Sequence, residues 1–224
     1  MRIEGDAVND LQEIFLTIWN KETKQNIGGE AYFPKHKEQS DTTNVVVAIV
    51  DRTPKKNSRM LSHAYAMSIY SAQKMCTLST VFCAHILHQQ SASTHHRTGC
   101  GCHDYGFFRL RYSVYSGRRP LQTSQTDEKG SHRLYVQWRF HHSKIMMVDD
   151  IFCTVGTANL NSRSLRYDYE TNAFIFNKEI TGELNEMFQN DIEHCTQLTP
   201  EFWKKRSPWK KFVGWFANLF TPFL

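Results

Sequence analysis

The 224-residue sequence lacks several features that would assign a chain to a class at once. No apolar run reaches the roughly 18 residues that a membrane-spanning helix needs. The first ten residues, MRIEGDAVND, carry acidic side chains and no apolar segment of the kind that a secretory signal contains. No internal repeat is present either. With 40% hydrophobic residues and a formal net charge of +5, the composition is ordinary for a soluble or peripheral globular protein.

Acidic side chains are scarce in one segment, residues 75–139, which nevertheless holds six of the eleven histidines and four of the six cysteines. Its three acids are Asp104, Asp127 and Glu128. Cysteines so unevenly distributed do not indicate a disulfide framework. The stretch HHRTGCGCHDY, residues 95–105, has the residue types of a metal site. However, Cys100 and Cys102 are one residue apart and no second pair lies at zinc-finger spacing, so we predict no metal ligands.

Helical and extended patterns alternate outside that segment. Apolar residues recur at helical spacing over 8–19, 59–74 and 180–192, which predicts three helices. Short apolar or β-branched runs predict strands over 44–51, 144–148, 151–155 and 171–176. Periodicity is lost between about residues 75 and 140, where no element is predicted.

The strongest chemical signal is HHSKIMMVDDIFCTVGTANLNSRS, residues 141–164. His142 and Lys144 lie on the same side of an extended chain, because side chains alternate along a strand. An imidazole beside an ammonium suits a phosphodiester. The imidazole can attack phosphorus or carry a proton, and the ammonium can hold the phosphate oxygens. A surface strand with a solvated histidine and lysine is the alternative, but it leaves the GTAN turn unexplained.

Three further residues fit the same chemistry. Gly156 permits close approach of the backbone to a phosphate, and Asn159 offers a neutral amide donor. Such donors stabilise the negative charge that develops at the transition state. Glu170, at the edge of the last predicted strand, can bind the far nitrogen of the His142 imidazole and fix its tautomer.

These positions carry a family resemblance. The residues that match the HxKxxxxD…GxxN motif of the phospholipase D superfamily are His142, Lys144, Asp149, Gly156 and Asn159. The stretch GTANLNSRSLRYDYETNAFIF resembles the cardiolipin synthases, except that Asp168 stands where that family usually has asparagine. The opening RIEGDAVNDLQEIFLTIWN and the closing SPWKKFVGWFANLFTPFL resemble the same family. The resemblance covers about residues 1–74 and 140–224.

The resemblance implies an α/β fold: one half of a phospholipase D-like mixed sheet flanked by helices, disrupted at about 75–139. Residues 1–74 are the N-terminal part of the second phospholipase D-like domain of that family, and 140–200 carry its catalytic motif. Residues 201–224 form a basic, aromatic tail. Its composition favours contact with anionic lipid headgroups, while packing on its own domain and nucleic-acid binding are the alternatives.

The implied function is cardiolipin synthesis, in which one phosphatidylglycerol donates its phosphatidyl group to a second and glycerol is released. His142 is then the general acid and base, oriented by Glu170, while Asp149 braces the motif turn. Lys144, Gly156 and Asn159 hold the phosphate. No metal or organic cofactor is expected.

The expected partners are phosphatidylglycerol, anionic membrane lipid and an N-terminal half carrying a first motif. No nucleic acid is expected, and the expected location is the cytoplasmic face of a bacterial cell membrane. Because family members carry two motifs and this chain carries one, we expect the chain alone to be inactive. The alternatives are a single-motif phosphodiesterase or nuclease that completes its site as a homodimer, and a non-catalytic membrane-binding remnant.

Plausible codons can be written for residues 75–139 that, read one base later, encode a sequence typical of the family. For residues 96–104, the choice CAU CGA ACG GGG UGU GGA UGU CAU GAU then gives Ile-Glu-Arg-Gly-Val-Asp-Val-Met, a helix end and a strand. The same offset works over 82–85, 120–129 and 130–140. We infer that this segment is translated out of frame, with the frame restored just before His142. We expect it to be disordered or poorly packed.

Overall fold

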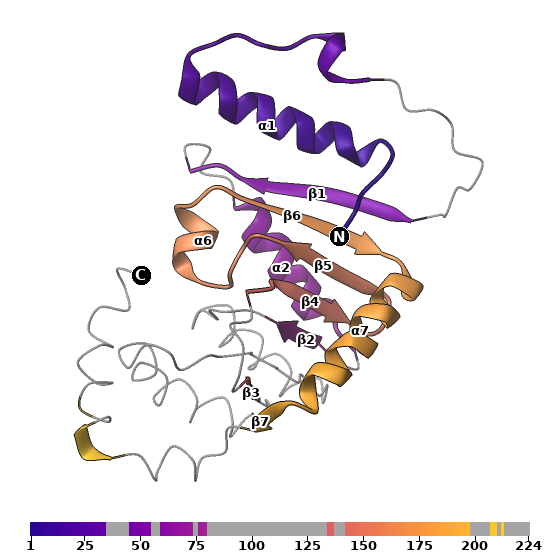
Figure 1. The fold of residues 1–224 in the computed structure, drawn as a ribbon, viewed down its shortest axis with the longest axis vertical. Helices are drawn as coiled ribbons and strands as arrows, with labels where there is room; N and C mark the ends of the chain where they lie inside the picture. Colours follow the sequence, from indigo (N-terminus) through magenta and orange to yellow (C-terminus); the bar gives the residue numbers. More distant parts are fainter. Residues whose placement is uncertain are drawn as a thin grey trace.

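The computed structural model describes residues 1–34, 45–54, 59–73, 76–79, 134–136, 142–197, 207–209 and 212 (Figure 1). The elements in chain order are α1 (Ala7–Thr23), a 3-10 turn (Glu30–Tyr32), β1 (Val46–Arg52), α2 (Met60–Ser71), β2 (Cys76–Ser79), β3 (Leu134–Val136), β4 (Ile145–Val148), β5 (Phe152–Gly156), α6 (Ser162–Arg166), β6 (Glu170–Phe176), α7 (Lys178–Ile192) and β7 (Cys195–Gln197). All seven helices and strands predicted from the sequence are present, with their ends shifted by a few residues.

Five of the strands form one sheet in the order β1-β6-β5-β4-β2. Each of the four pairings between these described strands is antiparallel. The α/β fold class is confirmed, although the parallel pairings of a mixed sheet are not among the described ones. Short connections explain the direction of the central strands, since a three-residue turn between β4 and β5 allows only an antiparallel pair.

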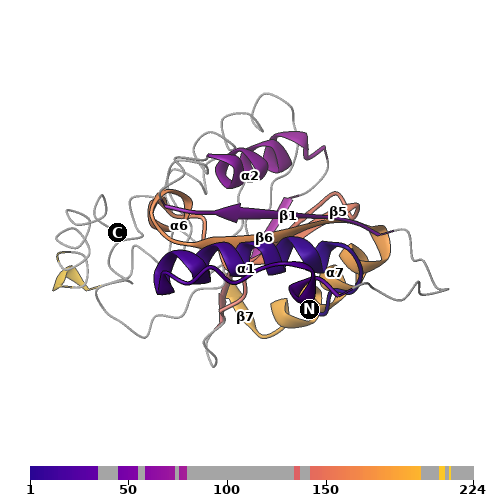
Figure 2. The same ribbon diagram turned by 90° about the horizontal axis from the view of Figure 1, so that it is seen from above.

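Helices cover both faces of this sheet (Figure 2). α2 lies on one face, where Leu61, Tyr65 and Ile69 join a core that includes Met146, Phe152 and Phe174. α7 lies on the other face, where Phe188 packs with Met147, Cys153 and Ile175. α1 runs alongside β1 (Figure 1). Side chains alternate along each strand, so consecutive residues of a strand point to opposite faces of the sheet. One faces the α2 core and the next faces the α7 core.

Two short strands lie within residues 75–139, the segment that the sequence predicts to be disordered or poorly packed. Residues 76–79 form β2, in register with β4, and Cys76 and Leu78 are buried in the α2 core. Two apolar side chains at alternating positions complete that core, so a break at residue 75 is too early. Residues 134–136 form β3, which pairs with β7. The other residues of 75–139, including 95–105, lie outside the described part, so the frame shift and the disorder stay predictions.

Candidate active site

All the predicted site residues except Asp149 lie at one end of the sheet. β4 begins directly after Lys144, β5 ends at Gly156 and β6 begins at Glu170. In β1, the last residue, Arg52, pairs with Glu170. The backbone N–H of Gly156 donates to the carbonyl of Lys144 at 3.2 Å, so the two halves of the motif are in direct contact. Antiparallel pairing produces this meeting, because it places the start of one strand beside the end of the next.

The polar side chains of the site also share one face of the sheet. Alternation along β4 places Lys144 on the same side as Met146, and alternation along β6 places Glu170 on the same side as Phe174. Met146 and Phe174 both belong to the core beneath α2. The site is therefore built on the α2 face, at the rim where the apolar core ends.

His142 and Lys144 form a direct pair. Lys144 has only 6% of its surface exposed, whereas His142 is exposed. The Lys144 Nζ lies 3.0 Å from His142 Nδ1, and it donates to the His142 carbonyl at 2.7 Å. While the ammonium donates to Nδ1, the neutral imidazole carries its hydrogen on Nε2. Burial lowers the pKa of Lys144, and the carboxylate of Glu170 opposes that shift.

Glu170 is buried, with 9% of its surface exposed, and a neighbouring hydroxyl holds it. The Thr157 Oγ1 donates to the Glu170 carboxylate and accepts from the backbone N–H of Thr171 at 3.0 Å. Glu170 therefore lies close enough to Lys144 for its charge to act on the ammonium. Its expected contact with His142 stays a prediction. Sequence reasoning missed Thr157, although a hydroxyl directly after the motif glycine was a usable signal.

Asn159 lies in the loop between β5 and α6, half-buried. The loop is anchored at both ends. At its start, the Thr157 N–H donates to the Thr171 carbonyl at 3.1 Å. At its end, the Asn161 side chain caps α6 by accepting from the Ser164 N–H at 2.8 Å. Asn159 is thereby carried on a short, fixed loop beside the β4–β5 end of the site.

The structure gives Gly156 a packing reason that the sequence did not suggest. A Cβ at this position would lie 2.3 Å from Asn172 Cγ and 2.4 Å from the Thr171 carbonyl oxygen. No side chain fits there, whatever binds nearby. The predicted role of Gly156 in approaching a phosphate stays a prediction, whereas its contact with Asn172 is a property of the fold.

Asp149 is the one predicted residue that the structure does not bring to the others. It lies in the β4–β5 turn, at the opposite end of β4 from Lys144. Its Oδ2 accepts from the backbone N–H of Gln73 at 2.6 Å, which ties the turn to the chain after α2. Asp149 and Asp150 both have positive φ, a conformation that aspartate tolerates. This placement supports the bracing role and leaves no direct part in the chemistry.

Arg52 is a buried cation at the rim that no sequence pattern indicated. It has 4% of its surface exposed, and its Nε donates to the Leu165 carbonyl at 3.2 Å. Its two terminal nitrogens donate to the carbonyls of Thr53 and Arg166. A cation at the last carbonyls of α6 stabilises that helix end and the chain that leads to Glu170.

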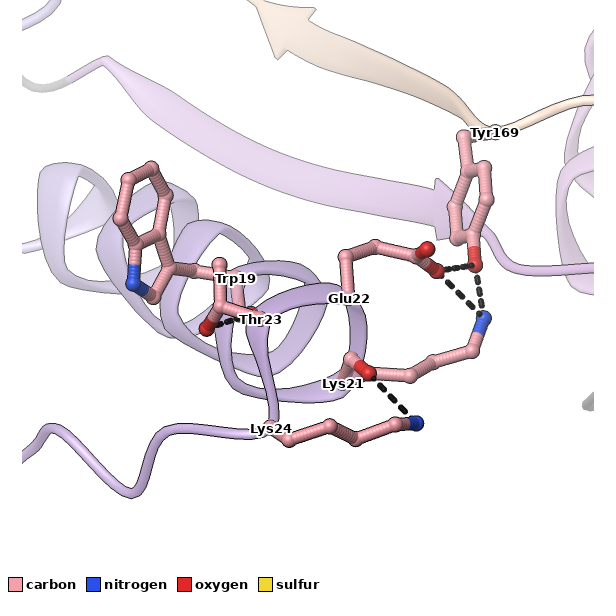
Figure 3. Close-up of polar contacts among 6 residues, drawn as sticks. All are labelled: Trp19, Lys21, Glu22, Thr23, Lys24 and Tyr169. Carbon is pink, nitrogen blue, oxygen red and sulfur yellow. Dashed lines mark hydrogen bonds and ion pairs between the residues drawn. The ribbon is translucent and has the colours of Figure 1, made fainter.

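Tyr169, which directly precedes Glu170, is held by the end of α1 (Figure 3). The Lys21 Nζ donates to the Tyr169 hydroxyl and lies 4.6 Å from the centre of its ring. The hydroxyl in turn donates to Glu22 at 3.4 Å. α1, far away in the sequence, therefore supports the segment that positions Glu170.

Neither a metal-binding cluster nor a membrane-spanning helix is present in the part of the chain that the structure describes. Among these residues, no group of three or more histidine, cysteine, aspartate or glutamate side chains could hold a metal ion. Within the described ranges, no helix is long and apolar enough to cross a bilayer. The tail, 201–224, lies mostly outside this part of the chain.

The fold and the site define a phospholipase D-like domain. NUC from Salmonella typhimurium, a phospholipase D family member, has the same fold with a TM-score of 0.56 and 13% identity. That match covers 69% of this chain and 98% of that chain. The phosphatidylserine synthase of Haemophilus influenzae matches with a TM-score of 0.59 and 17% identity, over 84% of this chain and 48% of that chain.

Residues 39–192 match the family described as cardiolipin synthase, PLD-like domain, and the chain belongs to this family. It is 29% identical to cardiolipin synthase 1 of Staphylococcus epidermidis over 233 residues, and 29% identical to the cardiolipin synthase of Listeria welshimeri over 234 residues. Each match covers 100% of this chain and 46% of the relative. The resemblance predicted from the sequence is confirmed, and the chain spans about half the length of the curated relatives it matches.

Proposed function

We propose that this chain supplies one half of a phosphatidyltransferase site, in the formation of cardiolipin and glycerol from two phosphatidylglycerol molecules. The observation that carries the proposal is the pair formed by His142 and Lys144. A buried ammonium lies 3.0 Å from an exposed imidazole, at the polar rim of a domain that belongs to the cardiolipin synthase family. This pair offers a phosphate two groups of the required chemistry in one place.

The reaction exchanges one alcohol for another on the phosphorus of a diester. An imidazole forms a P–N bond while the P–O bond to glycerol breaks, and a second imidazole gives the departing oxygen its proton. A hydroxyl of the second phosphatidylglycerol then returns a proton to the second imidazole and attacks phosphorus, which releases the first imidazole. We assign the proton-carrying role to His142.

Substrate binding is expected to change the partner of Lys144. Charged phosphate oxygens are stronger acceptors for an ammonium than a neutral imidazole is. The Lys144 ammonium then moves from His142 Nδ1 to the phosphate, and Nδ1 becomes open to protonation. Glu170 is expected to orient the His142 imidazole, which then protonates the departing glycerol.

The negative charge on the phosphate oxygens is expected to be held by Lys144 and by the side-chain amide of Asn159, with Gly156 permitting close approach of the backbone. Donors that are already in place do not have to reorganise as charge builds up, so they stabilise the transition state more than the ground state. The anchored loop of Asn159 supports this role.

The substrate places the reaction at a membrane surface. Phosphatidylglycerol is a bilayer lipid with an anionic headgroup, so we propose that the chain works on the cytoplasmic face of a bacterial cell membrane. The lysines and aromatic rings of residues 201–224 are expected to contact that surface. No metal or organic cofactor is part of this mechanism.

One motif provides one imidazole, and the mechanism uses two. We therefore propose that a first half supplies the other histidine and that the chain alone does not turn over. The test is to incubate labelled phosphatidylglycerol vesicles with the chain alone, and with the chain co-expressed with the N-terminal half of the Staphylococcus epidermidis relative. Residues 80–139 are tested both as printed and in the shifted frame.

Cardiolipin and glycerol are expected only where both halves are present and the frame is restored. His142→Ala should abolish them, while His194→Ala, which changes an exposed histidine after α7, should not. Equal loss in both variants would contradict the proposal.

The alternative function is a homodimeric phosphodiesterase, because two copies of a single-motif chain also provide two imidazoles. Cleavage of DNA by the purified dimer, lost in His142→Ala, would establish it in place of the transferase. Binding to anionic vesicles with no turnover in any combination would instead establish a membrane-binding remnant.

A further inference from the structure

Asn172 is an amide in an apolar core. It lies on β6, two residues after Glu170, and its side chain is completely buried on the α2 face. A buried amide is costly unless its polar atoms find partners. Here the Nδ2 donates to Tyr65 Oη at 2.9 Å and to Thr154 Oγ1 at 3.2 Å. Its Oδ1 accepts from the backbone N–H of Ala158 at 3.2 Å. Both polar atoms are used, so Asn172 joins α2, β5 and the loop after β5.

The bond to Ala158 is the one that reaches the proposed phosphate-binding loop. Ala158 directly precedes Asn159 and is itself buried, so water cannot take the place of Asn172 as its acceptor. With Thr157 bonded to the Thr171 carbonyl, two successive backbone N–H groups of the loop are anchored on β6. The position of Asn159 therefore depends on the side chain of Asn172.

The motif glycine makes room for this arrangement. A Cβ on Gly156 would lie 2.3 Å from Asn172 Cγ and 2.5 Å from Asn172 Oδ1, the atom that accepts from Ala158. Any side chain at residue 156 would displace that oxygen. Gly156 therefore leaves the space that the side chain of Asn172 occupies, although the two residues are sixteen positions apart.

The other partners keep the amide in one orientation. Burial raises the pKa of Tyr65 far above its ordinary value, so its hydroxyl stays neutral and can accept from Nδ2. Thr154 provides a second hydroxyl acceptor on β5. With both acceptors on the Nδ2 side, the Oδ1 faces Ala158.

We propose that Asn172 is a positioning residue for the phosphate-binding loop: by accepting from Ala158 it sets the place of Asn159 relative to Lys144. This inference rests on the proposed function, because it takes Asn159 to be a phosphate ligand. A neutral amide suits the task because it combines an acceptor for the loop with donors for the two hydroxyls.

The test uses the ¹⁵N-labelled full chain with two readouts, hydrogen exchange at the Ala158 amide and the affinity for inorganic orthovanadate. Asn172→Leu removes all three bonds at similar volume. Thr154→Val is the matched control, because it removes one bond of the amide and leaves the bond to Ala158. Asn172→Leu should expose the Ala158 amide to exchange and weaken orthovanadate binding by about tenfold to a hundredfold. Thr154→Val should leave both readouts as in the wild type.

Equal effects of Asn172→Leu and Thr154→Val on both readouts would overturn the inference, because a purely stabilising residue acts in that way. If Asn172→Leu does not fold, hydrogen exchange is measured in the wild type alone. Slow exchange of the Ala158 amide supports its bond to Asn172, and rapid exchange contradicts that bond. A wild type that does not bind orthovanadate contradicts the proposed function instead, while the exchange measurement still tests the positioning of the loop.

Discussion

Lys144 shows how the site tunes a single group. Burial lowers the pKa of its ammonium and the Glu170 carboxylate raises it. We expect Glu170→Gln to lower the pKa of Lys144 further, because the carboxylate charge that opposes desolvation is then removed. A ¹³C-detected pH titration of the lysine side chains measures this shift. The control is Glu179→Gln, which changes an exposed carboxylate of α7. An unchanged or raised Lys144 pKa in Glu170→Gln would contradict the assignment of Glu170 to the site.

The same shift gives a pH dependence of stability. Because the folded-state pKa of Lys144 lies below its ordinary value of 10.5, the unfolded chain binds a proton more tightly in the window between the two. Unfolding then takes up a proton, so the contribution of Lys144 to stability rises with pH through that window. Denaturation at several pH values should show a shallower rise in Lys144→Met than in the wild type. An identical slope in both would argue against a buried ammonium.

Gly156 is predicted to be irreplaceable for reasons of space alone. Gly156→Ala should destabilise the fold by roughly 1–3 kcal/mol or more, because the new Cβ meets Asn172 and the Thr171 carbonyl. Gly182 in α7 is the matched control, since a Cβ there meets nothing within 4 Å. Gly182→Ala should stabilise by about 0.5–1 kcal/mol, as expected for a helix interior. Urea denaturation measures both, and a neutral Gly156→Ala would refute the packing.

Local spacing was enough to predict several residues that the structure places at one end of the sheet. His142, Lys144 and Asn159 belong to one compact motif, and Glu170 stands at the edge of the next strand. Arg52 and Asn172 were missed because their roles depend on bonds to residues distant in the sequence, which no local pattern contains. For Asp149, the sequence predicted a bracing role in the motif turn, and its bond to the Gln73 N–H supports that role.

At the scale of elements, periodicity located the helices and strands, whereas sheet order had to come from the structure. β2 was missed because Cys76 and Leu78 offer only two apolar positions at the start of a segment of unusual composition. The five-residue α6 is too short to show a helical period, and it forms because Asn161 caps it. Strand register set the site, and register depends on partners distant in the sequence.

The helix caps offer a test at this scale. The Asn177 side chain accepts from the Ile180 N–H at 2.9 Å and begins α7, whereas Asp6 at the start of α1 makes no side-chain cap bond. Asn177→Ala should therefore cost about 1 kcal/mol, and Asp6→Ala should cost less. Thermal denaturation followed by circular dichroism compares the two. A larger loss in Asp6→Ala would contradict the capping difference.

The chain spans about half the length of the curated relatives it matches, and the composition of residues 75–139 departs from the rest. β2 shows that residues 76–79 belong to the sheet, whereas the frame shift proposed for 75–139 stays a prediction. Restoring the shifted frame over 80–139 should raise the melting temperature, because the segment then regains a strand pattern and an amphipathic helix that can bury apolar surface. A calorimetric scan of both chains measures the change. An unchanged or lower melting temperature would contradict the proposed frame shift.

The measurement that tests the site most directly is a titration of the full chain with inorganic orthovanadate, followed at three side chains by nuclear magnetic resonance. If one phosphate pocket is present, the signals of the His142 imidazole, the Lys144 ammonium and the Asn159 amide will shift along a single binding curve. His142→Ala and Lys144→Ala will each weaken that curve. Binding curves that differ between the three signals, or signals that do not shift at all, would show that these three groups do not bind a common phosphate.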